Sequence, residues 1–394
     1  MAKEIIFSRR LWVILVGCLF CVILVVRSGF FSVEHDPFLS VQRARVLYTD
    51  NSRLSPDPHV DGLLIGRQTI EIELLSGNHI GQLVRIENTL SRFFNHLAEE
   101  NMELLVHVRE HDGRISYVDV FSHSRSTFIY IFIGLFLLVL IAVGRKKGLY
   151  SAISLLFTIS LVVFLFIPSI IQGSSPVMMA IAVAFLTTMF SILVVSDISF
   201  KSLSAICGTL AGVAIAGVTS IIAGRFANIS GMHMSHAQEI FHQAGRDIAI
   251  SVPDLLFAGI IISALGAVID VGMTISSSIF EIKEVDPTIS TKNLYKRGMN
   301  IGRDIMGTMS NTLILAFAGS SLTIMVIIAL YQLSYLHFIN LNLLAVEIIQ
   351  GVSASIGLIL TVPVTAVLAA LLASDNKTTI FLRNKLNKKR GESK

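Results

Sequence analysis

The chain has 394 residues, of which 53% are hydrophobic and only 15% are charged. Its mean hydropathy is +0.73, which is too apolar for a chain that must dissolve in water. The formal net charge of +4 does not indicate a nucleic-acid partner, because the basic residues cluster beside apolar blocks, as they do in cytoplasmic loops. All three cysteines, Cys18, Cys21 and Cys207, lie inside apolar blocks, which argues against a disulfide scaffold or a cysteine zinc site.

Eight apolar segments are long enough to cross the bilayer as helices, which predicts an α-helical polytopic membrane protein embedded in lipid. The apolar segments do not show the short alternating pattern of a membrane β-barrel. The first segment is expected to be a retained anchor, because no small-x-small cleavage site follows Val26. The predicted spans are Leu11–Val26, Phe128–Val143, Leu149–Ile171, Val177–Val195, Leu203–Gly224, Leu255–Thr274, Thr312–Leu333 and Leu343–Ala373.

The distribution of Lys and Arg predicts that both termini are cytoplasmic. Every segment placed inside by this topology is basic, and the tail after Lys377 is the most basic. The expected layout is residues 1–27 as N-terminus and anchor, 28–127 as an extracytoplasmic domain, 128–376 as a seven-helix membrane domain and 377–394 as a cytoplasmic tail.

The segment 28–127 reads as β structure. Apolar and charged residues alternate at 43–48, 70–74 and 104–109, and hairpin signals occur at Ser76-Gly77-Asn78 and Asp112-Gly113. The stretch from Pro56 to Pro58 is expected to be a loop. About five short strands of this kind can close into a small barrel such as an OB-fold. We interpret the domain as a docking or assembly module, because it lacks the basic and aromatic pattern of a nucleic-acid reader.

Two polar stripes interrupt the membrane half of the sequence. Asp270 is followed at helical spacing by Thr274, Ser277 and Ser278, and Asp304 is followed in the same way by Thr308, Asn311 and Thr312. Ionisable groups are costly inside a bilayer, so these stripes are the strongest candidates for a functional site. Substrate or ion binding is assigned, as a hypothesis, to the following side chains: Asp270, Thr274, Ser277, Arg303, Asp304, Thr308 and Asn311.

Structural interpretations of the same stripes stay open. The repeated pattern is typical of an inverted repeat around a transporter site, but small polar residues are also common in helix packing. Asp270 alternatively pairs with Arg303 or caps a broken helix. Glu347 lies near the outer end of the last span and ranks below Asp270 as a site. His233, His236, Glu239 and His242 are spaced three residues apart, yet an interfacial helix explains them better than a metal site, and no metal or cofactor is predicted.

Two long segments resemble the signature segments of the YibE/F family of bacterial multi-pass membrane proteins. They are DLLFAGIIISALGAVIDVGMTISSS (254–278) and NIGRDIMGTMSNTLILAFAGSSL (300–322), and ELLSGNHIGQLVRIEN (73–88) is similar to the soluble portion of the YibE type. The resemblance implies a bacterial cell-membrane location and a YibF-like membrane partner, without a biochemical activity. The signatures fall on Gly266, Asp270, Gly302, Arg303, Asp304, Gly307, Asn311 and Gly319, and Ser263 stands where glycine is expected.

Three classes of function remain after these observations. We favour a transporter or channel-like permease, because an intramembrane carboxylate usually marks a pathway. The alternative is a non-transporting assembly or scaffold protein that recruits an envelope partner through the outer domain. An enzyme is not expected, because the sequence contains no Walker loop, nucleophile elbow or zinc signature.

Overall fold

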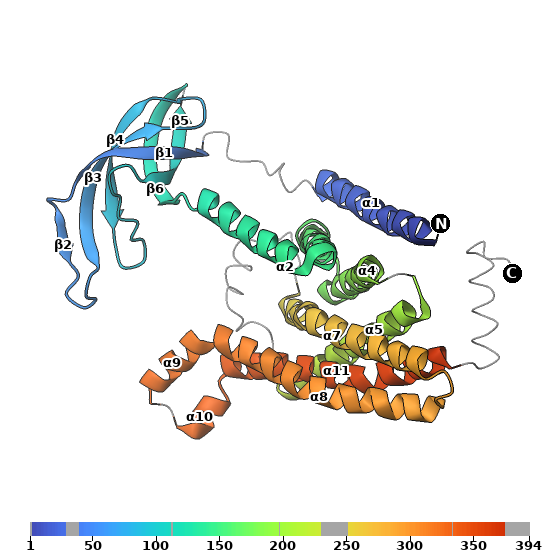
Figure 1. The fold of residues 1–394 in the computed structure, drawn as a ribbon. Coiled ribbons are helices and arrows are strands. Elements are labelled where there is room, and N and C mark those ends of the chain that lie inside the picture. The colour runs from blue at the N-terminus through green and yellow to red at the C-terminus, as the bar shows by residue number, and fades with distance from the viewer. Residues whose placement is uncertain are drawn as a thin grey trace. The chain divides into compact units, whose positions relative to one another are not determined.

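The fold is that of a computed structural model, which describes residues 2–28, 39–111, 113–196, 198–229, 251–332 and 334–374, with the backbone alone for residues 2–11. The chain divides into two compact units, one formed by residues 1–30 and 143–394 and the other by residues 31–142. The first unit is helical and the second contains the β-sheet (Figure 1).

The sheet is antiparallel throughout. It follows the order β2-β3-β1-β5-β6, and β4 pairs with β3 on the other side. Because β4 also contacts β6, the sheet curls into a half-barrel. The strands are β1 (Leu39–Asp50), β2 (Leu54–Pro56), β3 (Leu64–Leu74), β4 (Leu83–Leu90), β5 (Glu103–His111) and β6 (Arg114–His123).

The three alternating segments of the sequence lie in β1, β3 and β5, as expected. Their inward residues, including Val46, Ile72 and Val106, are fully buried in one core. Two expectations need correction. About five strands were predicted, and the described sheet has six; a loop was predicted at Pro56, and this residue is the last of β2. The short strand forms because Leu54 and Ser55 pair with β3, and a proline is tolerated at the end of a strand.

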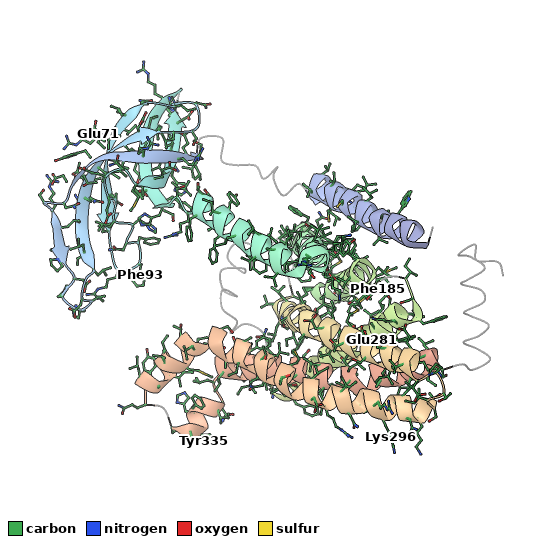
Figure 2. All side chains as sticks on the ribbon, in the orientation of Figure 1. Glu71, Phe93, Phe185, Glu281, Lys296 and Tyr335 are labelled. Atoms are coloured by element: carbon green, nitrogen blue, oxygen red, sulfur yellow. The ribbon has the colours of Figure 1, made fainter. Side chains whose placement is uncertain are left out.

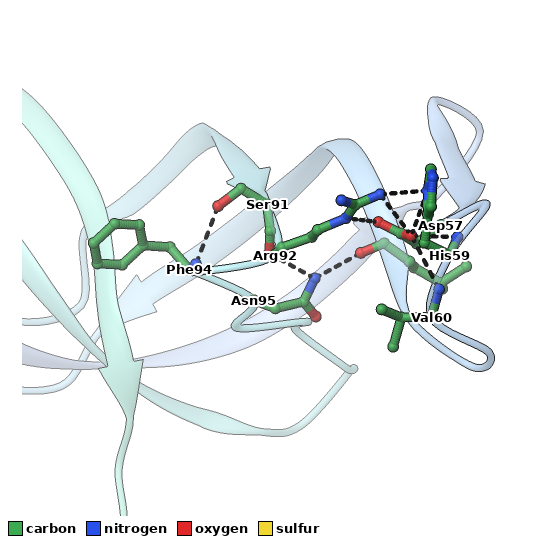
Figure 3. A network of polar contacts seen from close by, with 8 residues as sticks. Asp57, His59, Val60, Ser91, Arg92, Phe94 and Asn95 are labelled. Carbon is green, nitrogen blue, oxygen red and sulfur yellow. Dashed lines mark hydrogen bonds and ion pairs between the residues drawn. The ribbon is translucent and has the colours of Figure 1, made fainter. Parts of the chain in front are cut away.

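An ion pair between the buried carboxylate of Asp57 and the half-exposed guanidinium of Arg92 joins the two loops at one end of the sheet. The guanidinium of Arg92 donates to both carboxylate oxygens of Asp57, at 2.6 and 3.0 Å, and the backbone amides of His59 and Val60 donate to the same carboxylate (Figure 3). The hydrogen bond from Arg92 lowers the pKa of Asp57 and outweighs burial, which raises it. The loop that follows β4 is therefore held in one conformation.

The helices of the first unit pack around α7, with α5, α8 and α11 beside it (Figure 1). The helical elements are α1 (Ala2–Ser28), α2 (Ser126–Leu161), the π-helical segment η1 (Val162–Phe166), α3 (Ile167–Ile171), α4 (Pro176–Val195), α5 (Phe200–Phe226), α7 (Val252–Val285), α8 (Thr291–Ser320), α9 (Leu322–Leu330), α10 (Tyr335–Ile339) and α11 (Asn342–Ala373).

Small residues bring α5 and α11 close together. A Cβ atom added at Gly208 would collide with Thr365, and one added at Gly212 would collide with Thr361. Gly357 of α11 lies against Ala216 in the same way. These contacts form the kind of small-residue seam by which helices associate in lipid, where apolar side chains gain little from leaving the solvent.

The described residues contain five helical segments long and apolar enough to cross a membrane, or six if α8 and α9 count as one broken span. The eight predicted spans are therefore not confirmed. The segments predicted at 128–143 and 149–171 lie in one helical stretch, Ser126–Ile171, which is interrupted only by the non-helical backbone of Arg145 (φ 50°, ψ −128°). The apolar part of the first helix, Trp12–Arg27, is shorter than the others.

The seventh predicted span is also not one straight helix. α8 begins at Thr291, well before the predicted start at Thr312, and the chain bends by 56° between α8 and α9. The hydroxyls of Ser320 and Ser321 both donate to the carbonyl of Phe317 at this bend. A Gly-Ser-Ser sequence is a typical place for such a break, because side-chain hydroxyls then replace backbone donors.

Candidate functional site

Asp270 lines a groove of about 680 Å³ in the helical unit. Residues of α2, α4 and α7 form its walls, and the Asp270 side chain is exposed to it. We refer to it as the Asp270 groove. Eight of its lining residues carry polar side chains, namely Ser151, Ser154, Thr158, Thr187, Ser191, Ser263, Asp270 and Thr274.

The hydroxyl groups of the groove differ in how their hydrogen bonds are satisfied. Ser154 donates to Ser191 across the α2–α4 contact, and Thr274 donates to the carbonyl of Asp270 at 2.8 Å. The hydroxyl of Thr187 is buried and finds no hydrogen-bond partner among the described residues. A buried hydroxyl without a partner is unfavourable, so this wall carries an unsatisfied polar group beside the groove.

Asp270 has no counter-charge in the groove. None of the lining residues is a Lys or Arg, and within the described ranges no ion pair joins Asp270 to Arg303. Arg303 donates instead to Asn300 on its own helix, at 3.2 Å. The described residues therefore do not show the ion pair between Asp270 and Arg303 that was one of the structural interpretations.

One end of the groove lies close to the turn between α4 and α5. The Ser196 hydroxyl contacts the sulfur of Met273 at 3.9 Å, and Ser276 donates to the carbonyl of Lys201 at 2.7 Å. Met273 is less than one helical turn from Asp270. The carboxylate therefore lies near the end of the helix bundle at which this turn is found.

The second polar stripe, on α8, faces a different direction from the first. Gly298 and Gly302 of α8 lie against Ile279 and Ile275 of α7. Asp270 is five residues from Ile275, which places it about 140° away around the helix axis. The four predicted residues of α8, which are Arg303, Asp304, Thr308 and Asn311, are exposed and do not line the Asp270 groove.

The structure thus brings together only part of the predicted site. Asp270 and Thr274 share the groove, whereas Ser277 is half-buried and is not one of its lining residues. The sequence interpretation missed the hydroxyls of α2 and α4. Their signal was the helical spacing of Ser151, Ser154 and Thr158 within an apolar run, which puts the three on one face.

Two other candidates are weaker. Glu347 lies in a separate pocket of about 190 Å³ between the end of α8, α9 and α11, whose other lining residues are almost all apolar. The histidine cluster at 233–242 lies outside the described residues. In the part of the chain that the structure describes, no group of three or more His, Cys, Asp or Glu residues is placed to hold a metal ion.

Comparison with known families gives one match. The model of the YibE/F-like protein family matches residues 132–375, which include the Asp270 groove and both polar stripes. Comparison with curated proteins and with solved structures finds no match. The match covers well over half of the chain, and the chain therefore belongs to the YibE/F-like family.

Proposed function

We propose that this membrane protein is a transporter or permease for a small cation or a proton-coupled polar solute, with Asp270 as its binding carboxylate. The observation that carries the proposal is the arrangement of the groove, in which one carboxylate without a counter-charge faces hydroxyls from three helices. Hydroxyl and carboxylate oxygens are ligands for hard cations and also carry protons. A carboxylate used only for packing would be expected to have a basic partner.

The proposed topology retains eight spans with both termini inside. The helical stretch Ser126–Ile171 has 46 residues. At 1.5 Å per residue it is about 70 Å long, more than twice the roughly 30 Å of a bilayer core. Arg145, with Lys146 and Lys147, then separates two spans on the cytoplasmic side. The α4–α5 turn falls on that same side, so the groove opens toward the cytoplasm.

Cysteine labelling in intact cells tests this topology. An impermeant maleimide should label Ser76→Cys and spare Ser393→Cys in a background without the native cysteines. The opposite labelling pattern would overturn both the orientation and the direction in which the groove opens.

Flux into liposomes tests the transport proposal. Purified protein is reconstituted with the pH dye pyranine inside, and a proton gradient or a sodium gradient is applied. Asp270→Asn keeps the shape of the side chain and removes its charge, so flux should fall by at least about tenfold, the effect of roughly 1.4 kcal/mol on the barrier. Glu281→Gln is the matched control, because Glu281 is exposed on the same helix outside the groove. Equal flux in wild type and Asp270→Asn would overturn the proposal.

A scaffold function is the second candidate, and one feature of the outer domain favours it. Phe93 and Phe94 follow Arg92 in the loop that Asp57 holds, and their side chains are 92% and 72% exposed. Exposed aromatic side chains on a rigid loop are typical anchors for a protein partner. If the scaffold function is correct, the variant with both Phe93→Ser and Phe94→Ser loses the growth phenotype that the wild-type chain confers on cells, whereas Asp270→Asn keeps it. If the transport proposal is correct, Asp270→Asn loses that phenotype.

A further inference from the structure

Helix α8 has two opposite faces with different surroundings. Gly298 and Gly302 pack against α7 and α11, through Ile279, Val362 and Ile275. The opposite side forms the α8 polar face, defined here by Asn300, Arg303, Asp304, Gly307, Thr308 and Asn311, all of which are exposed. Lys296 continues the same face and points away from the bundle in Figure 2.

The C-terminal part of the α8 polar face continues into the part of the helix that is apolar enough to lie in the membrane. Gly302 is level with Ile275 of α7. Asn311 is nine residues farther along the helix, or about 13 Å deeper in the bundle. Asp304 and Asn311 have no hydrogen-bond or ion-pair partner among the described residues. None of the described residues covers these two side chains, and polar side chains that face acyl chains are strongly disfavoured.

We propose that the α8 polar face binds a second copy of this chain, α8 against α8, around a two-fold axis along the membrane normal. The charges of the face are self-complementary, because Arg303 and Asp304 are adjacent and a two-fold axis brings the guanidinium of each copy to the carboxylate of the other. Charged groups at the same level on two parallel helices then neutralise each other near the edge of the bilayer.

The deeper part of the face is also suited to a helix of the same sequence. A Cβ atom added at Gly307 would have nothing within 4 Å, so the backbone is open to close approach at this point. Asn311 follows one turn later, and an asparagine amide pairs well with a second asparagine amide across such an axis. The interface rests on α8 alone and does not depend on the function of the Asp270 groove.

Disulfide cross-linking in native membranes tests the contact. The chain is expressed alone in a heterologous bacterial host, with Cys18, Cys21 and Cys207 replaced by alanine, and the membranes are oxidised. Asn311→Cys should give a product of twice the chain's mass, because the proposed axis brings the two Asn311 side chains together. Val218→Cys is the matched control, because Val218 is 57% exposed on α5 and lies outside the proposed interface. Equal yields in the two variants would show that the product comes from random collision, and an Asn311 product of another mass alone would show that a different membrane protein is bound; either result would overturn the proposal.

Charge exchange provides a second test that is independent of the cross-link. Two differently tagged copies are co-expressed and one is purified, so that recovery of the other measures association. Asp304→Arg in both copies should lower recovery about tenfold, which corresponds to roughly 1.4 kcal/mol. Combining Asp304→Arg with Arg303→Asp should restore it, because the complementary pair is then present in reversed order. Both positions are exposed, so membrane abundance should stay constant. Wild-type recovery in the single variant overturns the proposal.

Discussion

The polar stripes of α7 and α8 have nearly the same sequence pattern but lie in different surroundings. On α7 the stripe around Asp270 borders a groove whose other walls, α2 and α4, supply hydroxyl groups. On α8 the stripe around Asp304 lies away from the packed glycines and is exposed among the residues that the structure describes. An aspartate followed four residues later by threonine therefore does not specify one role. The helices that surround each stripe decide whether it borders a groove or lies on an exposed face.

The largest expected effect distinguishes the two faces of α8. In Gly302→Val the added side chain collides with Val362 in the packed face, whereas in Gly307→Val it enters open space. Overpacking a well-packed site costs about 1–3 kcal/mol, so Gly302→Val should lower both membrane abundance and melting temperature. Gly307→Val should leave both close to wild type while weakening self-association. Fluorescence-detected size-exclusion and melting curves in detergent measure this, and equal destabilisation by both changes would contradict the assignment of the faces.

The sequence predicts which residues share a face of α7 or of α8, but it does not predict how these two faces are oriented relative to each other. Helical spacing placed Asp270 with Thr274 and Asp304 with Asn311 on single faces, and the structure agrees. Spacing does not report how a helix is rotated against its neighbour, however. Only the packing of Gly298 and Gly302 on α7 shows that the two stripes diverge.

The outer domain was predictable for a different reason. The strict alternation in β1, β3 and β5 has one structural solution, because every second residue must enter the core. The bend between α8 and α9 had only a weak local signal, the Gly-Ser-Ser sequence, which is also common in straight membrane helices. The break in α2 at Arg145 falls in the basic interval between the two predicted spans, 128–143 and 149–171, so its position was predictable although its backbone conformation was not.

The next expected effect concerns the groove of α7. Gly266 lines the groove, and a Cβ atom added there has nothing within 4 Å. Gly266→Leu should therefore fill part of the groove without disturbing the helix packing, and leucine is also a better helix former than glycine. We expect at least about a tenfold loss of flux in liposomes, equivalent to roughly 1.4 kcal/mol on the barrier, with unchanged melting temperature and self-association. A loss of protein in place of flux would show that the groove is closed in the membrane.

A smaller effect is expected when the carboxylate of α7 and the guanidinium of α8 are changed together. Because Asp270 and Arg303 do not pair in the described chain, Asp270→Asn should keep membrane abundance near wild type, within the roughly 0.5 kcal/mol typical of exposed sites. Adding Arg303→Gln should not rescue the flux defect, since changes at uncoupled sites are additive. Abundance by immunoblot and flux are measured for both single variants and the double variant. Restored abundance in the double variant would reveal an ion pair between α7 and α8.

The smallest effect uses a carboxylate that does have a partner. The hydrogen bond from Arg92 lowers the pKa of Asp57 in the folded outer domain. A carboxylate with a lowered pKa stabilises the fold fully above its unfolded pKa of about 3.9, and this contribution is lost as pH falls further, through the folded value. Hydrogen exchange of the amides of His59 and Val60 should therefore accelerate in acid beyond its chemical pH dependence.

Asp57→Asn should remove that acid-induced acceleration while raising exchange at neutral pH, because the charge-assisted bonds from Arg92 are already lost. Asp61→Asn, in the same loop but with an exposed side chain, is the control and should behave as wild type. Wild-type exchange that follows only its chemical pH dependence would mean that the Asp57–Arg92 pair does not hold the loop. It would also remove the contrast between Asp57, which has a fixed partner, and the carboxylates of Asp270 and Asp304, which have no ion-pair partner among the described residues.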